Sequence, residues 1–160
     1  MCFGVFAWLK WRNIDCEIAP EFAKECVWHD TTSLLEDQTA VFGEQHRRIF
    51  GLKKKVDVVL TDSPLILSVI YDRHHTQYLH DMVLSEFCKC NNLNFFLIRS
   101  KKYNPKGRLQ TEEEAQKIDN QIIEFLELHS IPFVNRPGTE EQTSVIGNLI
   151  LQTLASDCRI

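Results

Sequence analysis

The stretch that most constrains the fold runs from Val56 to Pro64, with the sequence Val-Asp-Val-Val-Leu-Thr-Asp-Ser-Pro. Its first part is an apolar run rich in β-branched residues, which predicts a buried strand. The strand ends at Asp62, where Ser63 is a favourable helix N-cap and Pro64 suits the first helical position. We therefore expect a strand, an acidic tip and then a helix, which is the repeating unit of α/β proteins.

Asp62 allows two interpretations. In open parallel sheets, ligands bind beyond the carboxyl ends of the strands. A carboxylate at such an end can hold Mg²⁺ for phosphoryl transfer, directly or through water. Asp62 can equally do no more than help to cap the helix that follows, because Asp-Ser-Pro is a common turn between a strand and a helix. The residues alone leave both interpretations open.

Hydrophobic spacing divides the rest of the chain into alternating strands and helices. Short apolar runs predict three further strands, at residues 14–18, 93–98 and 131–134. Helical spacing is found at residues 3–12, 21–28, 33–52, 64–71, 78–90, 111–129 and 139–154. Capping boxes predict two of the helix starts, at Ser33 with Glu36 and at Thr111 with Glu114. The alternation predicts a single α/β domain over residues 1–160, with a parallel sheet covered on both faces by helices in three layers.

Charged residues follow three of the predicted strands. Glu21 comes after the strand at 14–18 and Arg99 after the strand at 93–98. Because the carboxyl ends of parallel strands meet at one edge, we expect both to lie near Asp62. Two carboxylates and several cations are the residue types that phosphoryl transfer needs.

The segment of residues 99–111 is a candidate lid. Its first twelve residues, Arg-Ser-Lys-Lys-Tyr-Asn-Pro-Lys-Gly-Arg-Leu-Gln, hold five cations. Pro and Gly would permit hinging, and the cations, among them Lys102 and Arg108, could close over phosphate groups. The alternative is a solvated surface loop between a strand and a helix.

Composition excludes several functions and favours a cytoplasmic protein. The net charge of -4 argues against nucleic-acid binding through a basic face. No apolar stretch reaches the length that crosses a membrane. The six cysteines are scattered, which predicts free thiols in a reducing cytosol. His74, His75 and His80 lack the spacing of metal ligands, and we interpret them as surface histidines.

Four segments together resemble one protein family. They are Ala-Pro-Glu-Phe-Ala-Lys (19–24), Glu-Asp-Gln (36–38), the central stretch (56–64) and Tyr-Asn-Pro-Lys-Gly-Arg-Leu-Gln-Thr-Glu-Glu-Glu-Ala (103–115). Their order is similar to that of bacterial and phage P-loop ATPases with a ribosylnicotinamide kinase-like domain. The resemblance implies phosphoryl transfer from ATP, with Mg²⁺, to a nucleoside, a nucleotide or a similar small molecule.

The resemblance also implies a role for each candidate residue. Glu21 would orient or deprotonate the acceptor hydroxyl, and Asp62 would serve Mg²⁺. Gln38 would contact the substrate. The nucleotide phosphates would be contacted by Arg99, Lys102 and Arg108.

The chain departs from this family at its phosphate loop. No Gly-x-x-x-x-Gly-Lys-[Ser/Thr] sequence occurs, and the only early glycine is Gly4. Such a loop cradles phosphates with its backbone amides. The helix at 3–12 resembles the latter part of the helix that follows this loop, so we expect the chain to start after it, through truncation or a misassigned start. We accordingly expect weak or absent ATP turnover.

The missing first strand has a second consequence. In the family it lies in the middle of the sheet, between the strands predicted at 56–61 and 93–98. Its loss would leave a gap about one strand wide, with two unpaired inner edges. Either the strands close up, another chain fills the slot, or the product is poorly stable. The alternative function is therefore a non-catalytic binding or partner protein, with a homo-oligomer or a complementary chain filling the slot.

Overall fold

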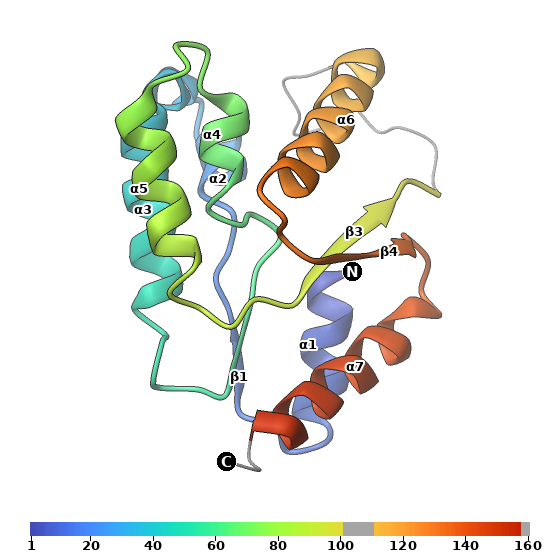
Figure 1. Cartoon of the computed structure of the whole chain (residues 1–160). Coiled ribbons are helices and arrows are strands. Elements are labelled where there is room, and N and C mark those ends of the chain that lie inside the picture. Colours follow the sequence, from blue (N-terminus) through green and yellow to red (C-terminus); the bar gives the residue numbers. More distant parts are fainter. Residues whose placement is uncertain (101–110, 158–160) are drawn as a thin grey trace.

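The structure is a computed structural model that describes residues 1–100 and 111–157 (Figure 1). Its helices are α1 (Cys2–Lys10), α2 (Phe22–Trp28), α3 (Gln38–Phe50), α4 (Leu67–Tyr71), α5 (Gln77–Phe87), α6 (Glu112–Leu128) and α7 (Gln142–Asp157), with a 3₁₀ helix η1 (Thr32–Glu36). Its strands are β1 (Cys16–Ile18), β2 (Val58–Leu60), β3 (Asn94–Ile98) and β4 (Phe133–Pro137). Among these helices, none is both long and apolar enough to cross a membrane.

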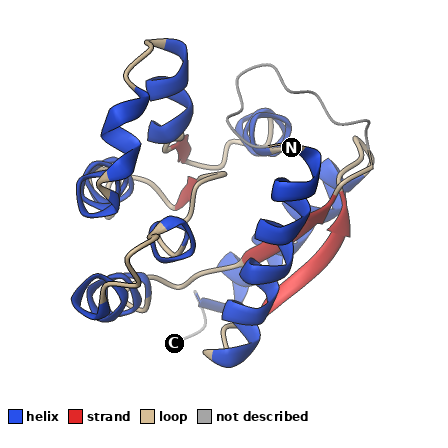
Figure 2. Cartoon of the chain, turned by 90° about the horizontal axis from the view of Figure 1, so that it is seen from above, coloured by secondary structure: helices blue, strands red, loops and turns tan. Residues whose placement is uncertain are grey.

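The strands form two separate parallel pairs, so the predicted three-layer parallel sheet is wrong. β1 pairs with β2 and β3 pairs with β4, and in residues 1–100 and 111–157 no ladder joins β2 to β3 (Figure 2). The molecule is instead a helix-rich mixed structure. A continuous sheet would need a strand that hydrogen-bonds to both β2 and β3, and no described strand does so. β1 and β2 are also short, with three residues each.

The inner edges of both pairs carry apolar residues. In β2, the N–H of Val58 and the carbonyl of Leu60 bond to the β1 side, so the backbone groups of Val59 face away from β1. In β3, the carbonyl of Ile98 accepts from Gly138, which directs the groups of Phe95 and Leu97 away from β4 by the same alternation. Each pair therefore presents an edge that no described strand covers.

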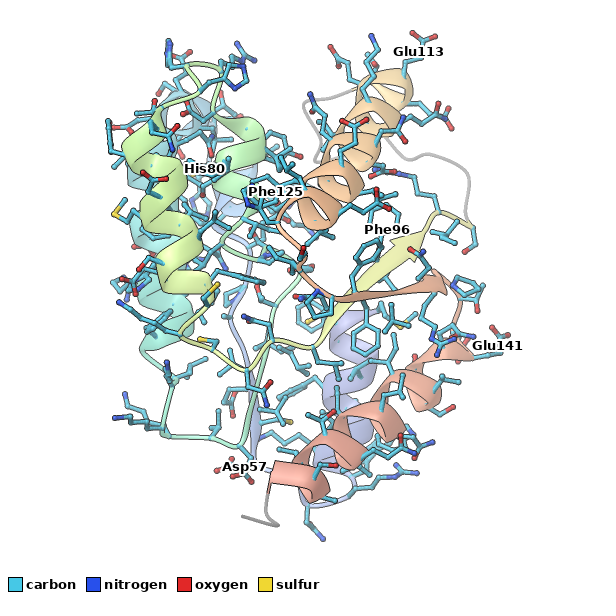
Figure 3. All side chains as sticks on the ribbon, viewed as in Figure 1. Asp57, His80, Phe96, Glu113, Phe125 and Glu141 are labelled. Carbon is cyan, nitrogen blue, oxygen red and sulfur yellow. The ribbon has the colours of Figure 1, made fainter. Side chains whose placement is uncertain are left out.

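Two hydrophobic clusters hold the molecule together. The larger lies among α3, α4, α5 and α6, and its buried residues are Phe42, Leu65, Ile66, Leu79, Val83, Phe87, Phe125 and Leu126. The second joins α1 and α7 to the strands through Val5, Leu9, Cys16, Ile146 and Ile150, with Val58, Leu60 and Phe95 packed against it. Side chains from all four strands or their flanks thus fill the space between the helices (Figure 3).

The contact between α1 and α7 is close enough to require a glycine. A Cβ atom on Gly147 would lie 2.4 Å from the Trp8 ring, closer than any side chain could tolerate. On the same interface, Gly4 lies against the side chain of Thr143. The glycines therefore allow the two helices to approach each other.

Helix starts show which local predictions hold. The capping box of Thr111 with Glu114 is confirmed, with both reciprocal hydrogen bonds present. The box predicted at Ser33 is wrong, because η1 occupies that segment and α3 begins later, where the Asp37 side chain accepts from two backbone N–H groups. Ser63 is not an N-cap either, because α4 begins only at Leu67.

Candidate active site

Glu21 and Asp62 follow the paired ends of β1 and β2. Ile18 lies opposite Leu60, and the N–H of Ala19 donates to the Leu60 carbonyl at 2.8 Å. The two segments that carry the carboxylates therefore leave the same end of one parallel pair. Glu21 is half-buried at the N-cap of α2, and Asp62 is exposed.

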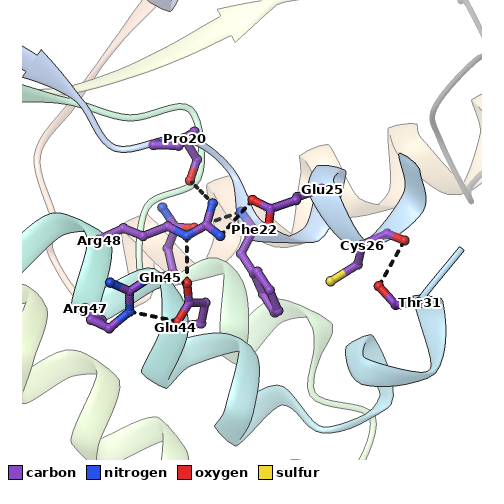
Figure 4. Close-up of polar contacts among 9 residues, drawn as sticks. All are labelled: Pro20, Phe22, Glu25, Cys26, Thr31, Glu44, Gln45, Arg47 and Arg48. Atoms are coloured by element: carbon purple, nitrogen blue, oxygen red, sulfur yellow. Dashed lines mark hydrogen bonds and ion pairs between the residues drawn. The ribbon is translucent and has the colours of Figure 1, made fainter. Parts of the chain in front are cut away.

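Gln45 on α3 ties these two segments together. Its side-chain oxygen accepts from the Phe22 N–H at 3.1 Å (Figure 4). Its side-chain nitrogen donates to the Thr61 hydroxyl at 3.4 Å. The Thr61 hydroxyl oxygen also accepts from the Ser63 N–H at 3.1 Å. Gln45 is only 3% exposed, so the amide is held in a buried position. The backbone next to each carboxylate is thereby fixed by the same side chain.

Arg48, one turn further along α3, holds the other side of Glu21. Its guanidinium donates to the Pro20 carbonyl at 3.3 Å and to the Glu25 carboxylate at 2.8 Å (Figure 4). It also bonds Glu44 at 3.0 Å. Residues on both sides of Glu21 are therefore anchored to α3, which favours a defined position for this carboxylate.

Glu44 is the carboxylate that balances the charge of α3. It accepts two hydrogen bonds from Arg47, at 2.7 and 3.0 Å, besides the one from Arg48. These bonds, that from Arg47 foremost, lower the pKa of Glu44 to about 2. The Glu44 carboxylate is therefore ion-paired with Arg47 and Arg48, and we do not count it among the ligand-binding groups.

Asp62 acts electrostatically on the first residue of α1. Burial raises the pKa of the Cys2 thiol to about 11, and the negative charge of Asp62 adds to this rise. Met1 caps α1 without a side-chain hydrogen bond. The Asp62 charge thus acts on the side chain at the first residue of α1, the end where the helix dipole is positive.

Of the three predicted cations, only Arg99 is among the described residues. Arg99 follows β3, and its guanidinium bonds the Asp119 carboxylate on α6 through two contacts, at 2.7 and 3.0 Å. Lys102 and Arg108, with most of the candidate lid at 99–111, lie outside the described residues. Arg99 thus links β3 to α6 in this structure.

Gln38 lies at a separate polar hollow. Its side chain donates to the Leu35 carbonyl at 2.7 Å, and with Asp72 and Tyr78 it lines a hollow of about 250 Å³. Asp72 accepts from the N–H groups of His74 and Thr76, which lowers its pKa. Through these two hydrogen bonds, Asp72 holds the backbone of the loop that precedes α5.

Neither Gln45 nor Arg48 was found from the sequence. Gln45 interrupts the buried face of α3 between Phe42 and Ile49, and a polar residue in that position is the signal that could have revealed it. Arg47 and Arg48 stand together near the end of α3, where the sequence alone predicts solvated charge that favours the helix dipole. Only Arg47 fits that interpretation, because the Arg48 side chain is 12% exposed.

The arrangement places two carboxylates at one end of a parallel strand pair. In residues 1–100 and 111–157, no three His, Cys, Asp or Glu side chains are grouped to hold a metal ion. A cation at this edge would accordingly take most of its ligands from water or substrate. Comparisons of the chain with known protein families, with curated proteins and with solved structures found no match.

Proposed function

We propose that the carboxyl end of β1 and β2 binds Mg²⁺·ATP and transfers a phosphoryl group slowly to a small hydroxyl compound of the nucleoside or nucleotide class. The observation that carries the proposal is the buried Gln45 amide, which fixes the segments of Glu21 and Asp62 side by side. Phosphoryl transfer depends mainly on positioning and electrostatics, which such a clamp supplies.

The donor set fits Mg²⁺ held by a single protein carboxylate. Mg²⁺ keeps several waters and is commonly bound by one or two carboxylates plus substrate phosphates. Asp62 is exposed at the edge and would be that carboxylate. When bound, the ion would neutralise charge on the phosphates. Glu21 would accept the hydrogen bond of the acceptor hydroxyl and orient it.

The low rate follows from the donors that the chain offers to phosphates. The sequence has no Gly-x-x-x-x-Gly-Lys-[Ser/Thr] loop. The first-turn N–H groups of α1, near Asp62, would donate to a phosphate instead. Such a helix end provides fewer donors than a full phosphate loop, so we expect binding and turnover well below those of an ordinary kinase.

The test is ADP release from Mg²⁺·ATP by the parent chain and by Asp62→Asn. The matched control is Asp57→Asn, which removes an exposed aspartate that precedes β2, at its opposite end (Figure 3). We expect slow release by the parent and by Asp57→Asn, and none by Asp62→Asn. Equal rates in all three proteins, or no release and no ATP binding by the parent, would refute the proposal.

A second candidate function is that of a partner protein, and the open strand edges favour it. Backbone N–H and carbonyl groups point away from the paired strand at Val59 in β2 and at Phe95 and Leu97 in β3. Strand edges without a pairing strand can add strands from other chains. We propose that a second copy of the chain is the occupant, because both edges are present on every copy and two copies can satisfy them mutually.

Sedimentation equilibrium tests this second function. Val59→Pro removes an N–H that faces the open edge and leaves the ladder between β1 and β2 intact. We expect the parent to be a dimer and Val59→Pro to be a monomer with an unchanged helical spectrum. A parent that stays monomeric across the concentration range contradicts self-association through this edge.

A further inference from the structure

Two histidines from distant parts of the sequence face each other between α5 and α6. The Nε2 atoms of His80 on α5 and His129 at the C-cap of α6 lie 3.2 Å apart. Two imidazole nitrogens that bind one tetrahedral Zn²⁺, each at about 2.0–2.1 Å, are about 3.3 Å apart. The pair therefore already has the separation that a shared metal ion requires.

A carboxylate orients the first of these rings. Nδ1 of His80 lies 3.4 Å from the Asp81 carboxylate, which in turn accepts from the Gln77 side chain at 2.8 Å. A proton on Nδ1 would be shared with Asp81, which leaves the Nε2 lone pair directed at His129. A carboxylate behind a histidine is the usual support of a metal-ligating imidazole.

Packing holds both rings in place. Phe125 is 8% exposed and contacts the His80 ring edge-on, with 5.8 Å between the ring centroids (Figure 3). The centroid of the His129 ring lies 4.4 Å from that of Phe125. The His80 side chain is 28% exposed, so solvent reaches it. His129 lies at the negative end of the α6 dipole, where a cation is favoured. The rings are thus fixed, while one side stays open to water.

We propose that His80 and His129 together bind a divalent transition-metal ion that prefers imidazole nitrogen, such as Zn²⁺. Both Nε2 atoms would be ligands, Asp81 would orient His80, and water would complete the coordination. When the proton of His80 is on Nδ1, the 3.2 Å contact without the ion is a hydrogen bond from the His129 Nε2–H to His80 Nε2. Binding moves the His129 proton from Nε2 to Nδ1, so both rings remain neutral and no proton is released. The site is independent of the proposed phosphoryl transfer.

The test is a Zn²⁺ titration of tag-free, metal-stripped protein, followed through the imidazole ¹⁵N resonances. We expect the Nε2 signals of His80 and His129 to shift together along one saturable curve. His74 and His75, which are exposed, serve as internal controls and should not follow that curve. A curve in which the two Nε2 signals move separately, or not at all, overturns the proposal.

Variants separate this site from binding at cysteines. His80→Gln should abolish the Zn²⁺-dependent shift of His129 and the rise in melting temperature that Zn²⁺ gives the parent. His75→Gln should retain both. Asp81→Asn should weaken binding by about tenfold, because it removes only the orienting carboxylate. If His80→Gln keeps the Zn²⁺-dependent shift of His129 and the rise in melting temperature, the ion binds elsewhere and the proposal fails. Circular dichroism of each variant serves as the control for folding.

Discussion

Replacing Gln45 with methionine tests whether the buried amide holds the two carboxylate segments together. Methionine has a similar length and no hydrogen-bonding amide. The change removes the 3.1 Å bond to the Phe22 N–H and the 3.4 Å bond to Thr61. A net loss of about 1 kcal/mol for the shorter bond, plus about 1–3 kcal/mol for the stranded N–H, gives roughly 2–4 kcal/mol. We expect the free energy of unfolding to fall by that amount.

Urea unfolding measures this loss. With a slope of about 2 kcal/mol/M, the midpoint of Gln45→Met should fall by roughly 1–2 M. Gln121→Met, an exposed position on α6, is the matched control and should stay within about 0.5 kcal/mol of the parent. If Gln45→Met is as stable as this control, the clamp contributes nothing and the argument for a positioned site is wrong.

Two further predictions concern stability. Gly147→Ala should lower the free energy of unfolding by about 1–3 kcal/mol, because the new Cβ atom meets the Trp8 ring. The control is Gly43→Ala, whose Cβ atom would have no neighbouring atom within 4 Å and which should stabilise α3 by up to about 1 kcal/mol. Thermal melts of the two variants and the parent measure both effects. Because Arg47 lowers the pKa of Glu44 from 4.5 to about 2 in the folded chain, Glu44 stabilises it above pH 4.5 and this contribution is lost as the pH falls toward 2. Glu44→Gln should thus be less stable than the parent at pH 7, by about 1 kcal/mol after solvent screening, and the difference should vanish in acid melts; a constant difference across that range would contradict this.

Local patterns in the sequence predicted most elements of the fold but not their assembly. Apolar runs located all four strands, and helical spacing located the helices, because both follow from side chains close in sequence. The single sheet was wrong, because no described strand joins the pair β1–β2 to the pair β3–β4, and no local pattern reports which strands share a sheet. The start of α3 failed for a smaller reason: Asp37 competes with Ser33 as a cap, and both fit the same rule.

The candidate site was predictable only in part. Glu21 and Asp62 are placed by the ends of their strands, so the sequence could indicate their position. Gln45 could be recognised only as a polar residue on an apolar face, without its partners. The approach of His80 to His129 depends on how α5 packs against α6, forty-nine residues apart in sequence. Contacts of that kind arise from tertiary packing, which spacing along the chain does not encode.

The packing of α1 against α7 sets an order of events during synthesis. The cluster among α3, α4, α5 and α6 can assemble once residue 128 has left the ribosome, because all of its helices precede that point. The cluster around Leu9 needs Ile146 and Ile150 as well. Because α1 is made before α7, the part of its apolar face that packs against Ile146 and Ile150 stays uncovered until α7 is complete. Pairing between two helices so far apart in the sequence slows folding, and this interval is when a chaperone would be most useful.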